Sequence, residues 1–165
     1  MTPKPIRRNE CIMKLSREHH FSLLFCWKIR EGLKRRIMPQ RIVLYAQHFW
    51  NNHMQPHFLE EEEILFAPLQ DEMVLKAMEE HEAIREGVEA LTVLPPENIT
   101  DELAKLADQL DKHVRYEERQ LFPYLESVLS DAQLDSIAAQ LNALPSTILK
   151  DDYPDEFWRE KNASL

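Results

Sequence analysis

The sequence contains very little glycine, only two residues in 165. It also lacks the alternating runs of β-branched and polar residues that are typical of half-buried strands. Leucine, glutamate, alanine and lysine, which favour helices, are abundant instead. These features exclude a mainly β fold. They predict one all-α domain, because a chain of this length can enclose a single hydrophobic core.

Long apolar runs and cysteines are scarce as well. The longest apolar stretch, residues 23–27, is far too short to span a bilayer. The first ten residues are followed by no apolar segment of the signal-peptide type, so we expect a cytoplasmic protein without membrane attachment. Cys11 and Cys26 would lie about 22 Å apart on one helix, which excludes an internal disulfide.

The charge balance argues against nucleic acid as a partner. The formal net charge is -9, which disfavours a nucleic-acid-binding surface. The basic run at residues 34–36 is interpreted as the C-terminal end of a helix, where cations complement the helix dipole.

Apolar residues recur with helical period along four long segments, which prolines separate. We predict helices over about Glu10–Arg36, Gln40–Phe66, Asp71–Thr92 and Thr100–Leu129. Thr100, followed by two acidic residues, is the predicted N-cap of the fourth helix. Pro56 lies inside the second segment and is expected to kink it.

A short fifth helix is predicted after Ser130, which begins a capping-box pattern, and Pro145 is expected to end it. Four long helices with short connections favour an antiparallel up-down four-helix bundle. We therefore divide the chain into an N-terminal extension (1–9), the bundle (10–145) and a C-terminal tail (146–165). Phe157 and Trp158 are the expected docking points of the tail.

One spaced pattern, H-x3-E-E-x2-L-F, occurs twice, at residues 57–66 and 113–122. Residues four apart share one face of a helix, so His57 with Glu61, and the second such pair, each present a nitrogen and an oxygen together. Such a pair can chelate iron, zinc or manganese. A single pair is expected by chance, whereas two copies with identical flanks are not. The alternative is two amphipathic helices that share a packing pattern.

The first and third helices are each expected to supply one histidine. His81 is central in the apolar stripe of the third segment. His19 and His20 are adjacent and point about 100° apart, so only one of them faces the core. His19 lies on the stripe and is preferred, while His20 is the ligand if the helix is rotated. The predicted metal ligands are His19, His57, Glu61, His81, His113 and Glu117.

Six such donors are too many for one ion and predict a dinuclear site. We expect two iron ions, bridged by the two carboxylates and an oxo or hydroxo group, with zinc or manganese as substitutes. His53 also faces inward and is interpreted as a packing residue, and His48 is expected to face solvent. The run of glutamates at 60, 62 and 63 is interpreted as a solvated flank.

These residues resemble the hemerythrin-like family, described by its His-His-Glu cation-binding motif. The resemblance covers residues 10–145 and rests on the two paired motifs and on the Glu-His steps at 18–19 and 80–81. It implies a four-helix bundle around a non-haem di-iron centre that binds dioxygen or nitric oxide, or handles iron. A ferritin-like site would use Glu-x-x-His, and none of the seven histidines fits that pattern.

The chain departs from the oxygen-carrying members in two ways. Ala77 stands where they have another histidine ligand, and Glu117 replaces an aspartate one residue further on. The four-histidine, two-glutamate set is more similar to the di-iron domain of the iron–sulfur-cluster repair proteins, whose cysteine-bearing N-terminal domain is not seen here.

The leading functional hypothesis is a protein that binds or senses a small diatomic ligand, dioxygen or nitric oxide. The alternatives are a di-iron enzyme that acts on peroxide or nitric oxide or in cluster repair, and a structural bundle without metal. The sequence indicates no oligomeric state.

Overall fold

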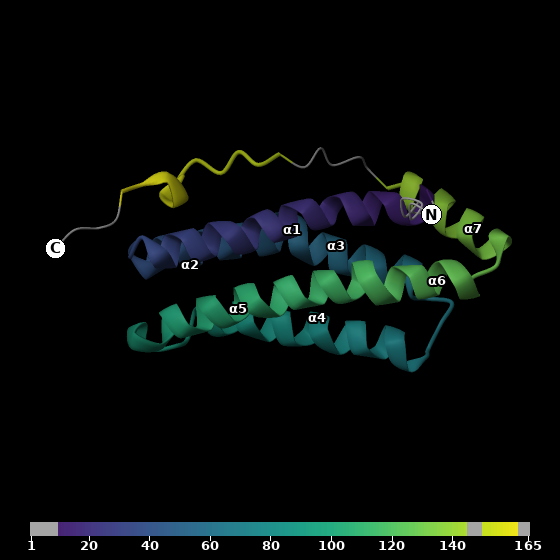
Figure 1. Ribbon diagram of the computed structural model, residues 1–165, viewed down its shortest axis with the longest axis horizontal. Helices are drawn as coiled ribbons and strands as arrows, with labels where there is room; N and C mark the ends of the chain where they lie inside the picture. The colour runs from purple at the N-terminus through teal and green to yellow at the C-terminus, as the bar shows by residue number, and fades with distance from the viewer. Residues whose placement is uncertain (1–9, 145–149, 162–165) are drawn as a thin grey trace, which may run out of the picture.

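The structure is a computed structural model that describes residues 10–144 and 150–161. Four long helical segments run up and down beside one another, and a short fifth helix covers one end (Figure 1). No strand occurs among the described residues. The helices are α1 (Glu10–Lys34), α2 (Pro39–Phe49), α3 (Gln55–Glu60), α4 (Glu72–Ala90), α5 (Pro96–Tyr116), α6 (Phe122–Val128) and α7 (Asp131–Asn142).

The predicted all-α bundle is thus confirmed, with small errors at the helix ends. The first helix ends at Lys34, within the basic run, and Arg36 then adopts a left-handed φ of 56°. The fourth long helix starts with α5 at Pro96, so the prediction of Thr100 as its N-cap is wrong. Proline suits the first helical position because its φ is already helical and its missing N–H needs no partner there. The capping box at Ser130 is confirmed. Pro145 lies outside the described residues.

The second and fourth long helices contain π-helical turns. These turns are η1 (Trp50–Met54), η2 (Glu61–Leu65) and η3 (Glu117–Leu121), and each closes with a backbone bond between residues five apart. Pro56 lies two residues after the end of η1, next to the residue Gln55 whose N–H closes that turn, so the missing proline N–H falls beside a wider helical turn. The η2 and η3 turns begin at the carboxylates of the repeated motif.

The apolar core is divided into two clusters. One lies between α1, α2 and α5 and contains Phe25, Ile42 and Leu106, all fully buried. The other is built around Leu15 and Phe122 and continues onto α7. A layer of buried histidines and glutamates belongs to neither cluster. The bundle therefore encloses a polar layer between two apolar ends.

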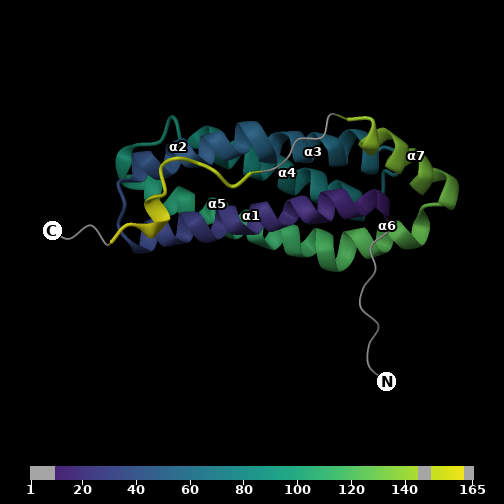
Figure 2. The same ribbon diagram turned by 90° about the horizontal axis from the view of Figure 1, so that it is seen from above.

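The described part of the C-terminal tail, residues 150–161, runs along the outside of α1 (Figure 2). Phe157 and Trp158 start a 3-10 turn, η4 (Phe157–Arg159), and both are buried as predicted. Gly32 makes room for this turn, since a Cβ there would lie 2.7 Å from the Phe157 ring. Lys28 is also buried, pairs with Asp151 and lies 3.8 Å from the Trp158 ring centre.

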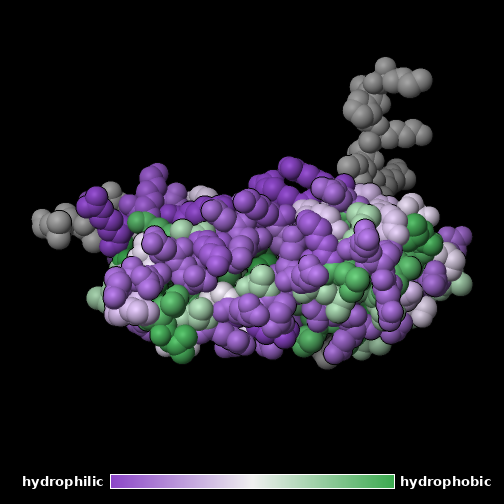
Figure 3. Space-filling model, turned by 90° about the horizontal axis from the view of Figure 1, so that it is seen from below, coloured by the Kyte–Doolittle hydropathy of each residue, from purple (hydrophilic) through white to green (hydrophobic). Residues whose placement is uncertain are grey.

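The surface is mostly polar, as expected for a bundle whose apolar side chains lie in its core. Seen from below, hydrophilic residues cover most of the molecule, with hydrophobic ones in small separate patches (Figure 3). Among the described residues, no helix combines the length and apolar character needed to cross a membrane. Cys11 and Cys26 are both buried and no disulfide joins them, as the predicted separation requires.

Candidate metal centre

Six side chains converge in the polar layer, and they are the residues that the sequence pattern selects. None of them is more than 4% exposed. They form two groups whose ligand atoms all lie within 4.8 Å of one another. Each group has two histidines and shares the same two glutamates. The first group is His19, His57, Glu61 and Glu117, and the second is Glu61, His81, His113 and Glu117.

The two shared glutamates lie between histidines from different helices. Glu61 Oε1 is 3.0 Å from His57 Nε2 on its own helix and 3.4 Å from His81 Nε2 on α4. Glu117 Oε1 is 2.5 Å from His113 Nε2 and 3.6 Å from His19 Nε2. Each carboxylate can therefore bridge the two groups, while each imidazole serves only one.

The atoms that face this cavity have no hydrogen-bond partner. These atoms are the Nε2 nitrogens of all four histidines and both carboxylate oxygens of Glu61 and Glu117. An unsatisfied buried polar atom costs about 1–3 kcal/mol, more when it is charged. Such a concentration of orphaned donors and acceptors is stabilised by a cation, and mixed nitrogen and oxygen ligands fit iron, manganese or zinc. The side chains present thus fit a metal centre.

Four further glutamates lie behind the histidines, and the sequence analysis did not assign them this place. Glu62 was predicted to be a solvated flank, which is wrong, because its Oε1 lies 3.0 Å from His81 Nδ1. The matching residue of the second motif, Glu118, lies 2.7 Å from His19 Nδ1. The hydrogen bond from His81 lowers the pKa of Glu62.

The Glu-His steps on α1 and α4 supply the other two outer carboxylates. Glu80 lies 2.9 Å from His113 Nδ1, and Glu18 lies 3.4 Å from His57 Nδ1. Both glutamates directly precede an inward histidine in the sequence. Because neighbours on a helix point about 100° apart, each faces the adjacent helix rather than the cavity.

The last residue of each repeated motif also contacts the next helix. Phe122 stacks on His19, with ring centres 5.4 Å apart, and Phe66 lies in the same way over His81 at 6.1 Å. The η2 and η3 turns lie between the bridging glutamate and this phenylalanine. The repeat thus encodes a bridging carboxylate, an outer carboxylate and an aromatic cover as one unit.

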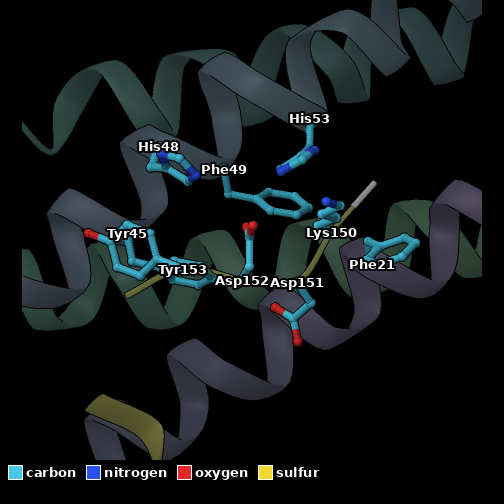
Figure 4. Close-up of a pocket in the computed structure, with 9 residues that line it drawn as sticks. All are labelled: Phe21, Tyr45, His48, Phe49, His53, Lys150, Asp151, Asp152 and Tyr153. Atoms are coloured by element: carbon cyan, nitrogen blue, oxygen red, sulfur yellow. The ribbon is translucent and has the colours of Figure 1, made fainter. Parts of the chain in front are cut away.

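The remaining histidines lie away from the cavity. His20 is exposed, and His48 is exposed as predicted. His53 is half-buried and packs against the Phe49 ring with centres 5.2 Å apart, in agreement with the interpretation as a packing residue. Figure 4 shows His48 and His53 opposite Asp152 of the tail. The cavity between them is ≈ 20 Å³, room for about one water molecule.

A wider pocket gives solvent access to the edge of the cluster. Its volume is ≈ 210 Å³ and it lies between α1 and the second long helix. His57 and its partner Glu18 form part of its wall, together with Lys14 and Arg17. A small molecule that enters this pocket reaches one of the six inward side chains.

Comparison with known proteins agrees with this geometry. The family model of the hemerythrin HHE cation-binding domain matches residues 14–125, and again residues 76–144. The chain belongs to this hemerythrin HHE family. The first match covers all six inward side chains, and the second covers most of α4 and the whole of the second motif. Searches among curated proteins and solved structures gave no match. The HHE domain is a cation-binding domain, and its buried histidines and glutamates fit a metal site.

The carboxylates of the HHE site raise the proton affinity of the imidazoles. Burial lowers the pKa of His57, but the charge of Glu61 and the bond to Glu18 outweigh burial and raise the pKa to about 10. The pKa values of the other three inward histidines are raised as well. Burial raises the pKa of Glu117, yet His113 outweighs it and holds that pKa well below its ordinary value.

We expect metal binding to release protons, because an imidazolium must lose its Nε2 proton before it can coordinate. Zinc titration calorimetry at neutral pH, in buffers of different ionisation enthalpy, measures this release. The pH dependence of the stability of the metal-free protein should report the raised pKa values of the same histidines. The stabilisation from His57 is complete below its unfolded pKa of 6.5 and is lost as the pH rises through about 10. Metal-free protein that becomes more stable over this window would contradict the assignment.

The choice between the two adjacent histidines of α1 gives a matched pair of variants. His19 is 3% exposed and belongs to the first ligand group, whereas His20 is exposed and packs edge-on against Phe21. His19→Ala should weaken metal binding strongly, and His20→Ala should have little effect. Metal content after equilibrium dialysis compares the two. The reverse ranking would show that His20 is the ligand.

Proposed function

We propose that this HHE domain holds two iron ions and that the loaded protein binds or senses dioxygen or nitric oxide. His19 and His57 would hold one ion, His81 and His113 the other, and the two bridging glutamates would contact both. The observation that carries the proposal is the set of orphaned, buried ligand atoms in two groups with shared carboxylates. A structural bundle without metal would leave these buried atoms no partners except one another, in Nε2 to carboxylate ion pairs.

The number of protein ligands supports an open site. Two imidazoles and two shared carboxylates supply four donors to each ion, and iron takes up to six. Ferrous ions in such a site supply electrons and free coordination positions to a diatomic ligand. Ala77, which is fully buried one turn before His81, occupies the place of a further histidine in the oxygen carriers. Its methyl group offers no ligand atom there.

The surroundings of the cavity favour a small ligand. The six inward side chains are buried, and Phe58 stacks on His81 with ring centres only 3.8 Å apart. The ≈ 210 Å³ pocket beside His57 is an opening that touches the cluster. Dioxygen and nitric oxide are small enough to pass between buried side chains, which favours them as ligands of this cluster.

The test uses protein loaded with ferrous iron under anaerobic conditions and mixed with dioxygen in a stopped-flow spectrophotometer. We expect rapid oxidation with growth of near-ultraviolet absorption, and no long-lived oxygen adduct, because the site has one histidine fewer than the oxygen carriers. Mixing with nitric oxide should give a distinct spectrum. A stable adduct that forms reversibly would indicate an oxygen carrier and would contradict the effect expected from the missing histidine. The absence of any spectral change with either gas would refute the proposal.

A further inference from the structure

The outer glutamates and the inward histidines form a closed ring of hydrogen bonds around the bundle. Each of the four long helices contributes one histidine and one outer glutamate. The glutamate of each helix bonds the histidine of the next helix along the chain, and the last returns to the first. The four Nδ1 to carboxylate pairs are His57 with Glu18, His81 with Glu62, His113 with Glu80, and His19 with Glu118.

The ring determines which nitrogen of each imidazole faces the cavity. An ionised carboxylate can only accept a hydrogen bond, so Nδ1 must carry the proton in every one of the four pairs. This leaves each Nε2 directed inward, and the four Nε2 atoms are the nitrogens without a partner. All four rings thus share one orientation, with Nδ1 toward the outer glutamate and Nε2 toward the cavity.

Further side chains hold the outer glutamates in place. Ser16 on α1 donates to Glu118 at 2.7 Å, so this link between the first and fourth long helices has two bonds. Lys76 donates to Glu80 at 3.1 Å. Lys14 lies 3.5 Å from Glu18, at the edge of the ≈ 210 Å³ pocket. Glu18 also makes the longest bond of the ring, 3.4 Å, and is its weakest link.

We propose that Glu18, Glu62, Glu80 and Glu118 are positioning residues that preset the four imidazoles for metal binding. The role as a metal site rests on the proposed function, whereas the preset orientation can be measured in metal-free protein. Because each bond joins two different helices, the ring also sets the spacing of the helices around the cavity.

Nuclear magnetic resonance of metal-free, ¹⁵N-labelled protein at neutral pH tests the orientation directly. We expect four Nδ1-bound protons that exchange slowly with water, one for each ring bond. Glu80→Ala should remove the signal of His113 and leave the other three. Rapid exchange of all four protons in the wild-type protein would overturn the proposal, whatever metal the protein binds.

Zinc affinity, measured by competition with a chelating dye, tests the effect on binding. Glu80→Ala should weaken zinc binding by roughly 10–100-fold, the usual cost of removing a carboxylate that orients a histidine ligand. Glu80→Gln keeps an oxygen that accepts from Nδ1 and should retain part of the affinity. Glu79→Ala, which changes an exposed neighbour on the same helix, is the control and should bind like wild type. Glu18→Ala should have the smallest effect of the four ring variants.

The outcomes separate the two proposals. If the wild-type protein binds no metal, the proposed function fails, and the resonance experiment still decides the ring. If the wild type binds zinc and Glu80→Ala binds equally well, the ring has no positioning role. Equal losses for Glu80→Ala and Glu80→Gln would show that charge alone matters, which also contradicts positioning. Circular dichroism of each variant verifies that the bundle is folded.

Discussion

Replacing Glu117 with alanine should abolish binding of both metal ions rather than one. Its carboxylate is fully buried and belongs to both ligand groups. Removal therefore takes a donor from each ion and also leaves the Nε2 of His113 without its nearest partner. The loss of affinity should exceed the roughly 10–100-fold that removal of an outer carboxylate costs. Metal content after anaerobic iron loading, determined by mass spectrometry, measures the effect.

Two companion variants make this result interpretable. Glu117→Gln preserves the shape of the side chain, so a loss of metal in this variant cannot be attributed to a cavity. Glu63→Ala removes an exposed glutamate at a variable position of the first motif and should keep the full metal content. If Glu117→Ala retains one tightly bound ion, the carboxylate is not shared and the two-group description is wrong.

Removal of the metal should destabilise the bundle by an amount that is large for a protein of this size. A ligand at a thousandfold excess over its Kd stabilises the folded state by about 4 kcal/mol for each site. In a domain of this length each kcal/mol changes the Tm by roughly 2–4 °C, so loss of two ions should lower it by roughly 15–30 °C. Differential scanning calorimetry of loaded and chelator-treated protein gives this difference.

The Glu117→Ala variant serves as the control for this experiment as well. It should melt at the same temperature with and without chelator, because it holds no metal to remove. A wild-type protein whose Tm does not change after complete demetallation would mean that the orphaned atoms of the cavity are satisfied in some other way.

Helical periodicity was sufficient to predict the inward side chains. A period of 3.6 residues places His19 inside and His20 outside, and the structure buries the first and exposes the second. The same rule places His57 beside Glu61. These predictions depend only on the geometry of one helix, and the helices are long enough for the apolar stripe to define their phase.

The outer glutamates could not be predicted in this way. Glu62 faces His81 because of the order in which the helices pack and the distance between them, and neither is encoded in one helix. The repeat distinguishes Glu62 and its counterpart Glu118 from the other charges beside them, but one helix alone does not show that either faces a histidine. The π-helical turns were also missed, since a bond between residues five apart has no marker in composition. The repeated spacing from Glu61 to Phe66 was a signal for them, and the sequence analysis did not interpret it.

The internal repeat connects the fold to the site. Each half of the chain supplies a Glu-His step on one helix and the H-x3-E-E-x2-L-F motif on the next. The two halves then provide one ligand group each and share their bridging carboxylates. The proposed dinuclear site thus draws ligands from both copies of the motif.

The number of metal ions bound to each chain tests the central claim most directly. Protein loaded with ferrous iron under anaerobic conditions and freed of excess metal should contain two iron ions per chain, by mass spectrometry against amino-acid analysis. Two ions are predicted because two ligand groups of four side chains share Glu61 and Glu117. A content that never exceeds one ion per chain, at any loading, would contradict the account.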